Sequence, residues 1–329
     1  MKSTKWNKCL TALTATCALM IVASPARAEY PQQPISLIVP YATGGAVDVV
    51  GRIVGAALAE QLGQSVVVEN KAGAAGNIGA QFVKRAKPDG YTLLMAATTS
   101  YALNGKLMDK SVVGFDLLKD FTPVSMVGEL PILLVVNQGM GVKTVPELVA
   151  KLKAEPGRHA YASAGPGTVE QAVAEMFRMR EGLQLLHVPY RGAAPAMVDL
   201  LSGQTQIMFA TAPTALANLG SGRITALGVA SAKRIPVLPD LPTMIEQGLP
   251  GFTAQSVYGI LVAKGTPDAI VQKLNAAMKT MSDSPQFREK LQQQGIVPLY
   301  TTVPQSRERL DGEVAKWSKV IDDAKITLQ

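Results

Sequence analysis

Residues 35–62 read ISLIVPYATGGAVDVVGRIVGAALAEQL, and this stretch joins a short apolar run to a longer amphipathic segment through a loop of small residues. Residues 35–39 have the length and apolar character of a buried strand. From Val47 onward the apolar residues recur with the 3.6-residue period of a helix, and Gly63 is suited to end it. A strand, a tight loop and a helix in this order form the repeating unit of an α/β fold.

The same unit recurs along the chain. Short apolar runs predict strands, most of them followed by a helical pattern, at residues 35–39, 66–69, 91–97, 132–136, 161–163, 185–188, 207–210, 225–230 and 257–263. Strands that are apolar on both faces are typical of parallel sheets covered by helices. We therefore expect an α/β fold with mostly parallel sheets flanked by helices.

The length of 329 residues suggests two domains, at about 150 residues per domain. Two stretches without clear periodicity divide the chain: residues 115–131, and a segment interrupted by Pro236, Pro239, Pro242 and Pro250. We expect one lobe at residues 29–128 plus 252–329 and a second lobe at residues 129–251. A two-lobed protein of this kind places its ligand in the cleft between the lobes.

Residues 1–28 have the features of a cleavable export signal. Three lysines precede an apolar run at residues 10–23, and small residues stand at 26 and 28, which predicts cleavage after Ala28 and export to the periplasm. A membrane anchor is the alternative, but the run is shorter than the roughly 18 residues that span a bilayer. Both cysteines, Cys9 and Cys17, fall in this segment, so the mature chain has neither a disulfide nor a thiolate metal site.

The charge of the mature chain excludes some partners. The formal net charge is +7, and removing the four basic residues of the signal leaves 28 basic and 25 acidic residues, or +3. No Lys/Arg cluster is longer than a pair, so we expect no binding to nucleic acid or to a membrane surface.

Nothing in the sequence indicates catalysis. His159 and His187 have no second histidine or cysteine at metal-ligand spacing, and the chain has no Gly-x-Ser-x-Gly motif. Gly73, Gly76 and Gly79 lack the close first pair of a dinucleotide fingerprint and predict a surface loop. We expect no catalytic residues, no metal and no cofactor.

Four loops that follow predicted strands, at residues 40–48, 97–101, 163–168 and 189–193, are rich in small residues. Ligands of open α/β sheets collect at the carboxyl ends of strands, and glycines beside helix N-termini favour an anion. As an alternative, these are tight turns capped by Asp48 and Thr168. The candidate ligand-binding residues are Tyr41, Ala42, Thr43, Gly44, Gly45, Asp48, Thr98, Thr99, Ser100, Tyr101, Ser163, Ala164, Gly165, Gly167, Thr168, Tyr190, Arg191, Gly192 and Phe209.

Aromatic side chains are candidates for flat walls of the ligand site, and core packing is the alternative for Phe209. The aromatic candidates are Tyr41, Tyr101, Tyr190, Phe209 and Tyr258. Arg191 is a candidate partner for a second carboxylate, or a brace for its own loop.

Several motifs together resemble the solute receptors of tripartite tricarboxylate transporters, the Bug family, over essentially the whole mature chain. They are Tyr30-Pro31 with residues 35–45, Leu62-Gly63-Gln64 with VVVEN at 66–70, KPDGYTL at 87–93, residues 161–167, VPYRG at 188–192 and LPDLPT at 238–243. The resemblance implies a two-lobed periplasmic binding protein that closes on a small mono- or dicarboxylate, aliphatic or aromatic, and delivers it to an integral membrane permease. It places residues 41–45, 98–100, 163–168 and 190–192 at the ligand.

The chain departs from the family pattern at three places. Ala46 stands where Ser or Thr is usual, Gln171 where His is common, and Phe209-Ala210-Thr211 lacks an Asp that often follows that strand. These departures bear on which acid is bound, and the missing Asp weakens the case for an amino acid. Two other functions remain open: an exported hydrolase of carboxylate esters and a sensory ligand-binding protein for a two-component system. We expect a monomer.

Overall fold

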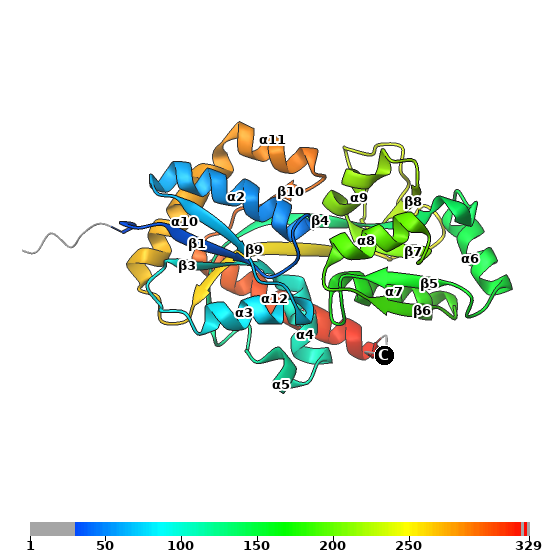
Figure 1. Ribbon diagram of the computed structural model, residues 1–329, viewed down its shortest axis with the longest axis horizontal. Helices are drawn as coiled ribbons and strands as arrows, with labels where there is room; N and C mark the ends of the chain where they lie inside the picture. The colour runs from blue at the N-terminus through cyan, green and yellow to red at the C-terminus, as the bar shows by residue number, and fades with distance from the viewer. Residues whose placement is uncertain (1–29, 324–325, 328–329) are drawn as a thin grey trace, which may run out of the picture. The chain divides into compact units, whose positions relative to one another are not determined.

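The computed structural model describes residues 30–323 and 326–327 (Figure 1). Residues 33–329 form one compact unit, and the account below concerns the described part of that unit. The predicted signal peptide and its cleavage after Ala28 lie outside the described residues.

The first part of the chain forms the expected strand and helix units. Strand β1 (Ile35–Val39) pairs in parallel with β2 (Val66–Asn70) and with β3 (Thr92–Ala97). Helices follow these strands, namely α2 (Ala46–Leu62), α3 (Asn77–Lys84) after the short η1 (Ala74–Gly76), α4 (Thr98–Leu107) and α5 (Lys110–Val113). Gly63 ends α2 at φ 63°, a left-handed conformation that glycine adopts without strain.

A 17-residue strand, β4 (Phe121–Asn137), runs through the middle of the sheet. Its residues 121–131 pair antiparallel with β9 (Gln255–Ala263), and residues 132–137 pair antiparallel with β7 (Ile207–Thr211) and β8 (Ile224–Val229). The expectation of an irregular segment at 115–131 is therefore wrong from Phe121 onward. Pro123 and Gly128 stand at register shifts, Pro123/Ser125 and Met126/Gly128, while Pro131 pairs in register with Gln255 at the end of β9.

The middle of the chain returns to parallel pairing. Strand β5 (Ala160–Ser163) pairs in parallel with β6 (Leu186–Pro189) and with β7, and the strand order is β2-β1-β3-β9-β4-β7-β5-β6. The sheet is mixed, because β4 and β9 run antiparallel to their neighbours. The remaining elements here are η2 (Gln138–Met140), α6 (Val145–Ala154), α7 (Val169–Glu181), α8 (Ala193–Ser202) and α9 (Ala212–Leu219).

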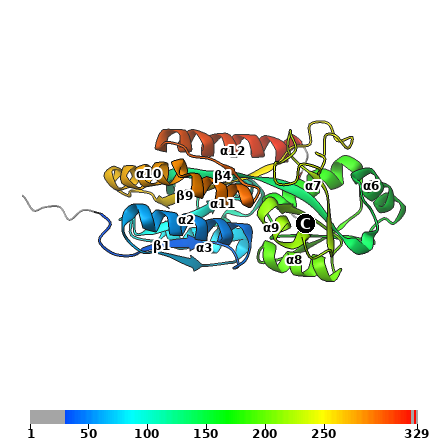
Figure 2. The same cartoon turned by 90° about the horizontal axis from the view of Figure 1, so that it is seen from above.

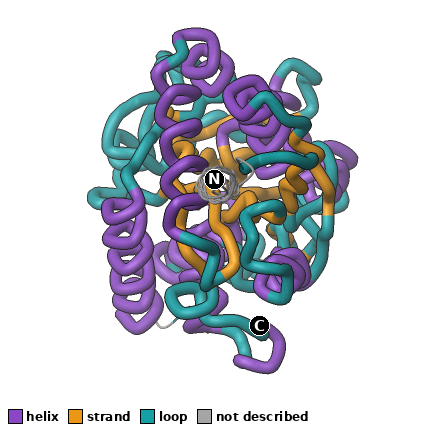
Figure 3. The backbone as a smooth tube through the Cα atoms, turned by 90° about the vertical axis from the view of Figure 1, so that its left-hand side faces the viewer, coloured by secondary structure: helices purple, strands orange, loops and turns teal. Residues whose placement is uncertain are grey.

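Helices cover both faces of the strands, which confirms the α/β class (Figures 1 and 3). The chain ends in α10 (Asp268–Asp283), α11 (Pro285–Gln293), the two-residue β10 (Val297–Pro298) and α12 (Val303–Asp323). Helices α10 and α11 pack against α2, and α12 packs against α4. Within residues 30–323 and 326–327, no helix is both long and apolar enough to cross a membrane.

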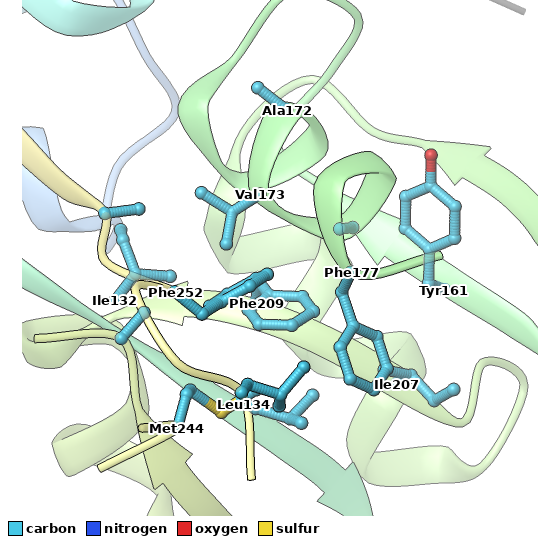
Figure 4. Packing of buried hydrophobic residues seen from close by; sticks show 14 of the residues in the cluster. Ile132, Leu134, Tyr161, Ala172, Val173, Phe177, Ile207, Phe209, Met244 and Phe252 are labelled. Atoms are coloured by element: carbon cyan, nitrogen blue, oxygen red, sulfur yellow. The ribbon is translucent and has the colours of Figure 1, made fainter. Parts of the chain in front are cut away.

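A cluster of phenylalanines forms part of the core beneath α7 (Figure 4). The ring centroid of Phe209 lies 5.6 Å from that of Phe177 and 6.1 Å from that of Phe252. Alternate residues of β7 face opposite sides of the sheet, so Phe209 packs under α7 while Met208 belongs to the other cluster. Phe209 is thus a core residue, in line with the alternative given for it from the sequence.

Candidate functional site

The first and fourth loops predicted from the sequence meet. Gly192 has φ 137°, and a β-carbon there would lie 3.4 Å from both the β-carbon and the backbone nitrogen of Ala42. A β-carbon on Gly44 would lie 3.9 Å from the β-carbon of Ala194. The starts of α2 and α8 are therefore neighbours. Figure 2 shows the N-terminal end of α2 beside α8 and α9.

The third loop joins the same cluster. A β-carbon on Gly165 would lie 2.9 Å from the carbonyl oxygen of Tyr190, which explains why this position is glycine. The backbone N–H of Val169, the first residue of α7, donates to the hydroxyl of Ser100 in α4 at 3.3 Å. Segments far apart in the sequence, at the starts of α2, α4, α7 and α8, thus come together.

A small cavity of about 20 Å³ lies where these segments meet. Four of the predicted ligand residues line it: Tyr41, Gly45, Ser100 and Ala164. Tyr258, predicted as a wall, lines it as well. The other lining residues are Ala46, Val47, Ala97, Glu170, Ala193 and Ser256.

Main-chain N–H groups at helix starts border this cavity. Helices α2, α7 and α8 begin after Gly45, Thr168 and Gly192, and none of these residues makes a side-chain cap hydrogen bond. Thr168 therefore does not cap α7 as the alternative interpretation required, whereas Asp48 accepts a hydrogen bond from the N–H of Gly44 in the turn before α2. The first N–H groups of a helix have no partner within the helix and carry the positive end of its dipole, so they favour an anion.

Asp48 braces the first loop rather than lining the cavity. Its carboxylate accepts hydrogen bonds from the N–H of Gly44 at 2.9 Å, from Arg52 at 2.9 Å and from the amide of Asn70 at 2.9 Å. The same amide donates to the carbonyl of Tyr41 at 3.0 Å. Burial raises the pKa of Asp48, but hydrogen bonds from Arg52, Gly44 and Asn70 outweigh it, and the pKa lies below its usual value.

Three residues of the second loop use their hydroxyl groups in hydrogen bonds to groups outside the cavity lining. The hydroxyl of Thr98 donates to the carbonyl of Val257 at 2.9 Å, and that of Thr99 donates to Glu313 at 2.7 Å. The hydroxyl of Tyr101 donates to the carbonyl of Gly76 at 3.2 Å. Because α4 begins at the residue after β3, successive side chains rotate around the helix, and only Ser100 of this group lines the cavity.

The remaining candidates shape the loops from outside the cavity lining. Tyr190 donates from its hydroxyl to Asp199 at 2.5 Å, Thr168 donates from its hydroxyl to the carbonyl of Gly165 at 2.7 Å, and Arg191 is exposed. The other residues of this group are Ala42, Thr43, Gly44, Ser163, Gly165, Gly167 and Gly192.

A serine and a histidine lie in contact next to the third loop, and a hydrolase would use such a pair as its nucleophile and base. Nε2 of His187 is 2.7 Å from the hydroxyl oxygen of Ser163, and Nδ1 is 3.4 Å from Nε2 of Gln171. The N–H of Gly167 donates to Oε1 of Gln171 at 2.7 Å, which turns the amide NH₂ toward the ring. This arrangement favours the tautomer in which Nδ1 accepts and Nε2 carries the proton, and in that tautomer the ring donates to Ser163 instead of taking its proton.

Sequence reasoning missed Glu170 and Ser256. Glu170, in the first turn of α7, is 6% exposed, and burial raises its pKa to about 7 against weaker opposing effects of its own N–H and the Thr168 hydroxyl. The Ser256 hydroxyl is buried and has no hydrogen-bond partner within residues 30–323 and 326–327. Ser256 and Tyr258 alternate on one face of β9, a period-two signal that could have pointed to Ser256 once Tyr258 was chosen.

Comparison with known proteins gives consistent matches. Residues 50–326 match the family described as "Tripartite tricarboxylate transporter family receptor". The protein BugT of Bordetella pertussis is 35% identical over 95% of this chain and 97% of its own length.

Three solved structures resemble this chain closely. An R. palustris protein with adipate is 32% identical with a TM-score of 0.88, over 91% of this chain and 99% of that one. The periplasmic binding protein BugD is 34% identical with a TM-score of 0.86, over 91% and 100%. MatC of Rhodopseudomonas palustris with bound malate is 31% identical with a TM-score of 0.80, over 89% and 100%. With its motifs, its fold and these matches in agreement, the chain belongs to the tripartite tricarboxylate transporter receptor family, which includes the Bug proteins.

Proposed function

We propose that the protein is a periplasmic receptor that binds a small carboxylate in the cavity beside Tyr41, Gly45 and Ser100. The observation that carries the proposal is the meeting of the α2, α7 and α8 N-termini at one cavity, with no cap from the side chains of their N-cap residues. The adipate and malate bound by two relatives support the choice of a carboxylate.

The energetics favour several donors acting together. Removing a carboxylate from water costs several kcal/mol. Each hydrogen bond to a charged group returns about 1.5 to 3 kcal/mol, and a helix N-terminus adds up to about 2 kcal/mol. Three or four donors therefore reach micromolar affinity, about −8 kcal/mol. One loop alone does not.

The two-lobe division explains how the donors are assembled. Residues 29–128 plus 252–329 supply α2, α4 and β9, and residues 129–251 supply α7 and α8. The ligand binds between them and stabilises the closed form, since it contacts both sides only there.

Delivery completes the function. Residues 1–28 direct export and are removed after Ala28, and the loaded monomer docks on the integral membrane permease of a tripartite transporter. Cross-linking in intact cells tests the partner: capture of permease subunits supports transport, whereas capture of a sensor kinase supports the sensory alternative.

Calorimetry and thermal unfolding with adipate, malate, succinate and benzoate test binding. Adipamide, which has the length of adipate and no charge, is the matched control. A ligand at one hundred times its Kd raises the free energy of unfolding by about 2.7 kcal/mol. A flat response to every acid, or an equal response to adipamide, contradicts the proposal.

A further inference from the structure

Glu170 places a carboxyl group in the wall of the cavity that is proposed to hold an anion. The side chain comes from the first turn of α7, and the residue is 6% exposed. Tyr41 and Tyr258 line the same cavity, and burial first and the charge of Glu170 second raise the pKa of both hydroxyls.

No cation offsets this carboxyl group. The described residues that line the cavity come from α2, α7, α8, β3, α4, β9 and the loops beside them, and they include no Lys, Arg or His. The titratable groups among them are Glu170 and the two tyrosines. An ionised Glu170 and a bound carboxylate would therefore face each other in a small, largely buried space, where like charges repel strongly.

We propose that Glu170 is neutral in the complex and donates its carboxyl proton as a hydrogen bond to the carboxylate of the ligand, so that binding takes up one proton from water. This inference rests on the proposed function. Glu170 would then determine specificity. Because its protonated carboxyl group donates a hydrogen bond, the ligand group beside it must be a hydrogen-bond acceptor, such as a carboxylate oxygen.

The free protein is already poised for this step. Burial brings the pKa of Glu170 to about 7, so protonation at neutral pH costs little. A bound anion raises the pKa of Glu170 further, because it disfavours the charged form. Pepsin-like carboxyl pairs use the same principle, in which two acid groups in contact share one proton.

Ser256 provides an independent observation at the same wall. Ser256 is 1% exposed, and its hydroxyl has no hydrogen-bond partner among the described residues, which is unfavourable in the free protein. A ligand oxygen that accepts from both Ser256 and a protonated Glu170 gives this orphaned group its partner.

Calorimetry at pH 6 and pH 8, in buffers of different ionisation enthalpy, tests the inference with adipate, malate, succinate and benzoate. A free-protein pKa of about 7 predicts a Kd that rises about tenfold from pH 6 to pH 8, with net proton uptake that approaches one at pH 8. The Glu170→Gln variant should bind without pH dependence or proton uptake. Glu181→Gln, at the far end of the same helix, is the matched control and should behave as the unmodified protein does.

A second readout does not depend on the variant's stability. The infrared difference spectrum of the unmodified protein at pH 8 should gain the band of a protonated carboxyl group when the acid binds. Binding that is independent of pH and takes up no proton overturns this inference and leaves the proposed function in place. So does tighter binding of glutamate than of glutarate at pH 8 that Glu170→Gln abolishes, because Glu170 would then pair as an anion with an ammonium group. Absence of binding by every acid at both pH values overturns the proposed function, and this inference with it.

Discussion

The hydroxyl oxygen of Ser163 lies 2.7 Å from Nε2 of His187, the distance at which a hydrolase would hold its nucleophile and base. Burial lowers the pKa of His187, so the ring is neutral at pH 7, and Gln171 directs a donor at Nδ1. In this tautomer His187 donates to Ser163. The ring also stacks on Tyr161 with centroids 4.7 Å apart, so it acts as a brace between β5 and β6.

His187→Ala should therefore affect stability and not ester hydrolysis. Its removal takes the shorter hydrogen bond from Ser163, which keeps only a longer one from the N–H of Gly165 at 3.2 Å among the described residues, and we expect a loss of about 1 to 2 kcal/mol in urea unfolding. The rate of p-nitrophenyl acetate hydrolysis should equal that of the Ser163→Ala variant and of buffer with an inert protein. A measurable esterase activity that both variants abolish would restore the hydrolase interpretation.

Gly45→Val should abolish carboxylate binding and leave the fold intact. Gly45 has φ −80°, which valine tolerates, and a β-carbon there meets nothing closer than the Ala42 carbonyl at 3.5 Å. The two methyl groups instead occupy the cavity at the start of α2. Circular dichroism and calorimetry measure the two effects. Gly312→Val in α12, where a β-carbon has no neighbour within 4 Å, is the control and should bind normally. Undiminished binding by Gly45→Val would mean that the ligand sits elsewhere.

Asp48→Asn should weaken ligand binding although Asp48 does not line the cavity, because Asp48 holds the first loop in place. The amide cannot accept as strongly from Gly44 and Arg52, so we expect a loss of about 2 to 3 kcal/mol in stability and a looser first loop. Since the pKa of Asp48 is lowered by folding, its contribution is present above the pKa of the unfolded chain and is lost as the pH falls through the folded value. Urea unfolding from pH 7 to pH 3 measures this.

Arg52→Gln is the comparison for Asp48, because the Arg52 side chain is 52% exposed and its pair is screened by water. The expected loss is below about 1 kcal/mol, with unchanged affinity. Equal losses in the two variants would show that the ion pair, rather than the Gly44 hydrogen bond, holds the loop.

Ser256→Ala should stabilise the free protein and weaken binding. Removing a buried hydroxyl that has no partner gains about 1 kcal/mol, whereas a ligand oxygen loses one donor and about tenfold in affinity. Ser125→Ala provides the contrast, since the Ser125 hydroxyl donates to the carbonyl of Met126 and accepts from the N–H of Thr301. That variant should lose stability and keep its affinity. The same pattern in both variants would remove Ser256 from the site.

Glu170→Gln should change how stability depends on pH in the ligand-free protein. The pKa of Glu170 is raised from 4.5 to about 7 on folding, so the folded state holds its proton more tightly and stability falls as the pH rises between these values. The cost reaches on the order of 3 kcal/mol above pH 7. In urea unfolding, the variant should therefore be more stable than the unmodified protein at pH 8 but not at pH 4.5. If the stability of the two proteins changed with pH in the same way, the Glu170 carboxyl group would be exposed to water.

Local patterns predicted the elements that local forces determine. The apolar run at residues 35–39 and the helix that ends at Gly63 were both predictable, because strand burial and a left-handed cap are encoded within a few residues. Strand β4 was not, since Pro123 and Gly128 suggest a turn in a short window, and both are accommodated at register shifts in the pairing with the distant strand β9.

The site was predictable as a set of loops but not as a set of side chains. Tyr41 and Ser100 line the cavity as expected, yet Thr99 next to Ser100 turns toward Glu313, which lies 214 residues away. Glu170 and Ser256 were missed for the same reason. Their direction depends on which side of α7 and β9 meets the cavity, and that is decided by packing between distant segments.

The donors at the starts of α2, α7 and α8 belong to the main chain, and no particular amino acid encodes them. After gene duplication, a copy of this protein can exchange Val47, Ser256 or Glu170 and acquire a different substrate while inheriting the same anchor for a negative charge. Such diversification requires only a few substitutions around an unchanged backbone, so paralogues that bind different ligands can keep the same fold.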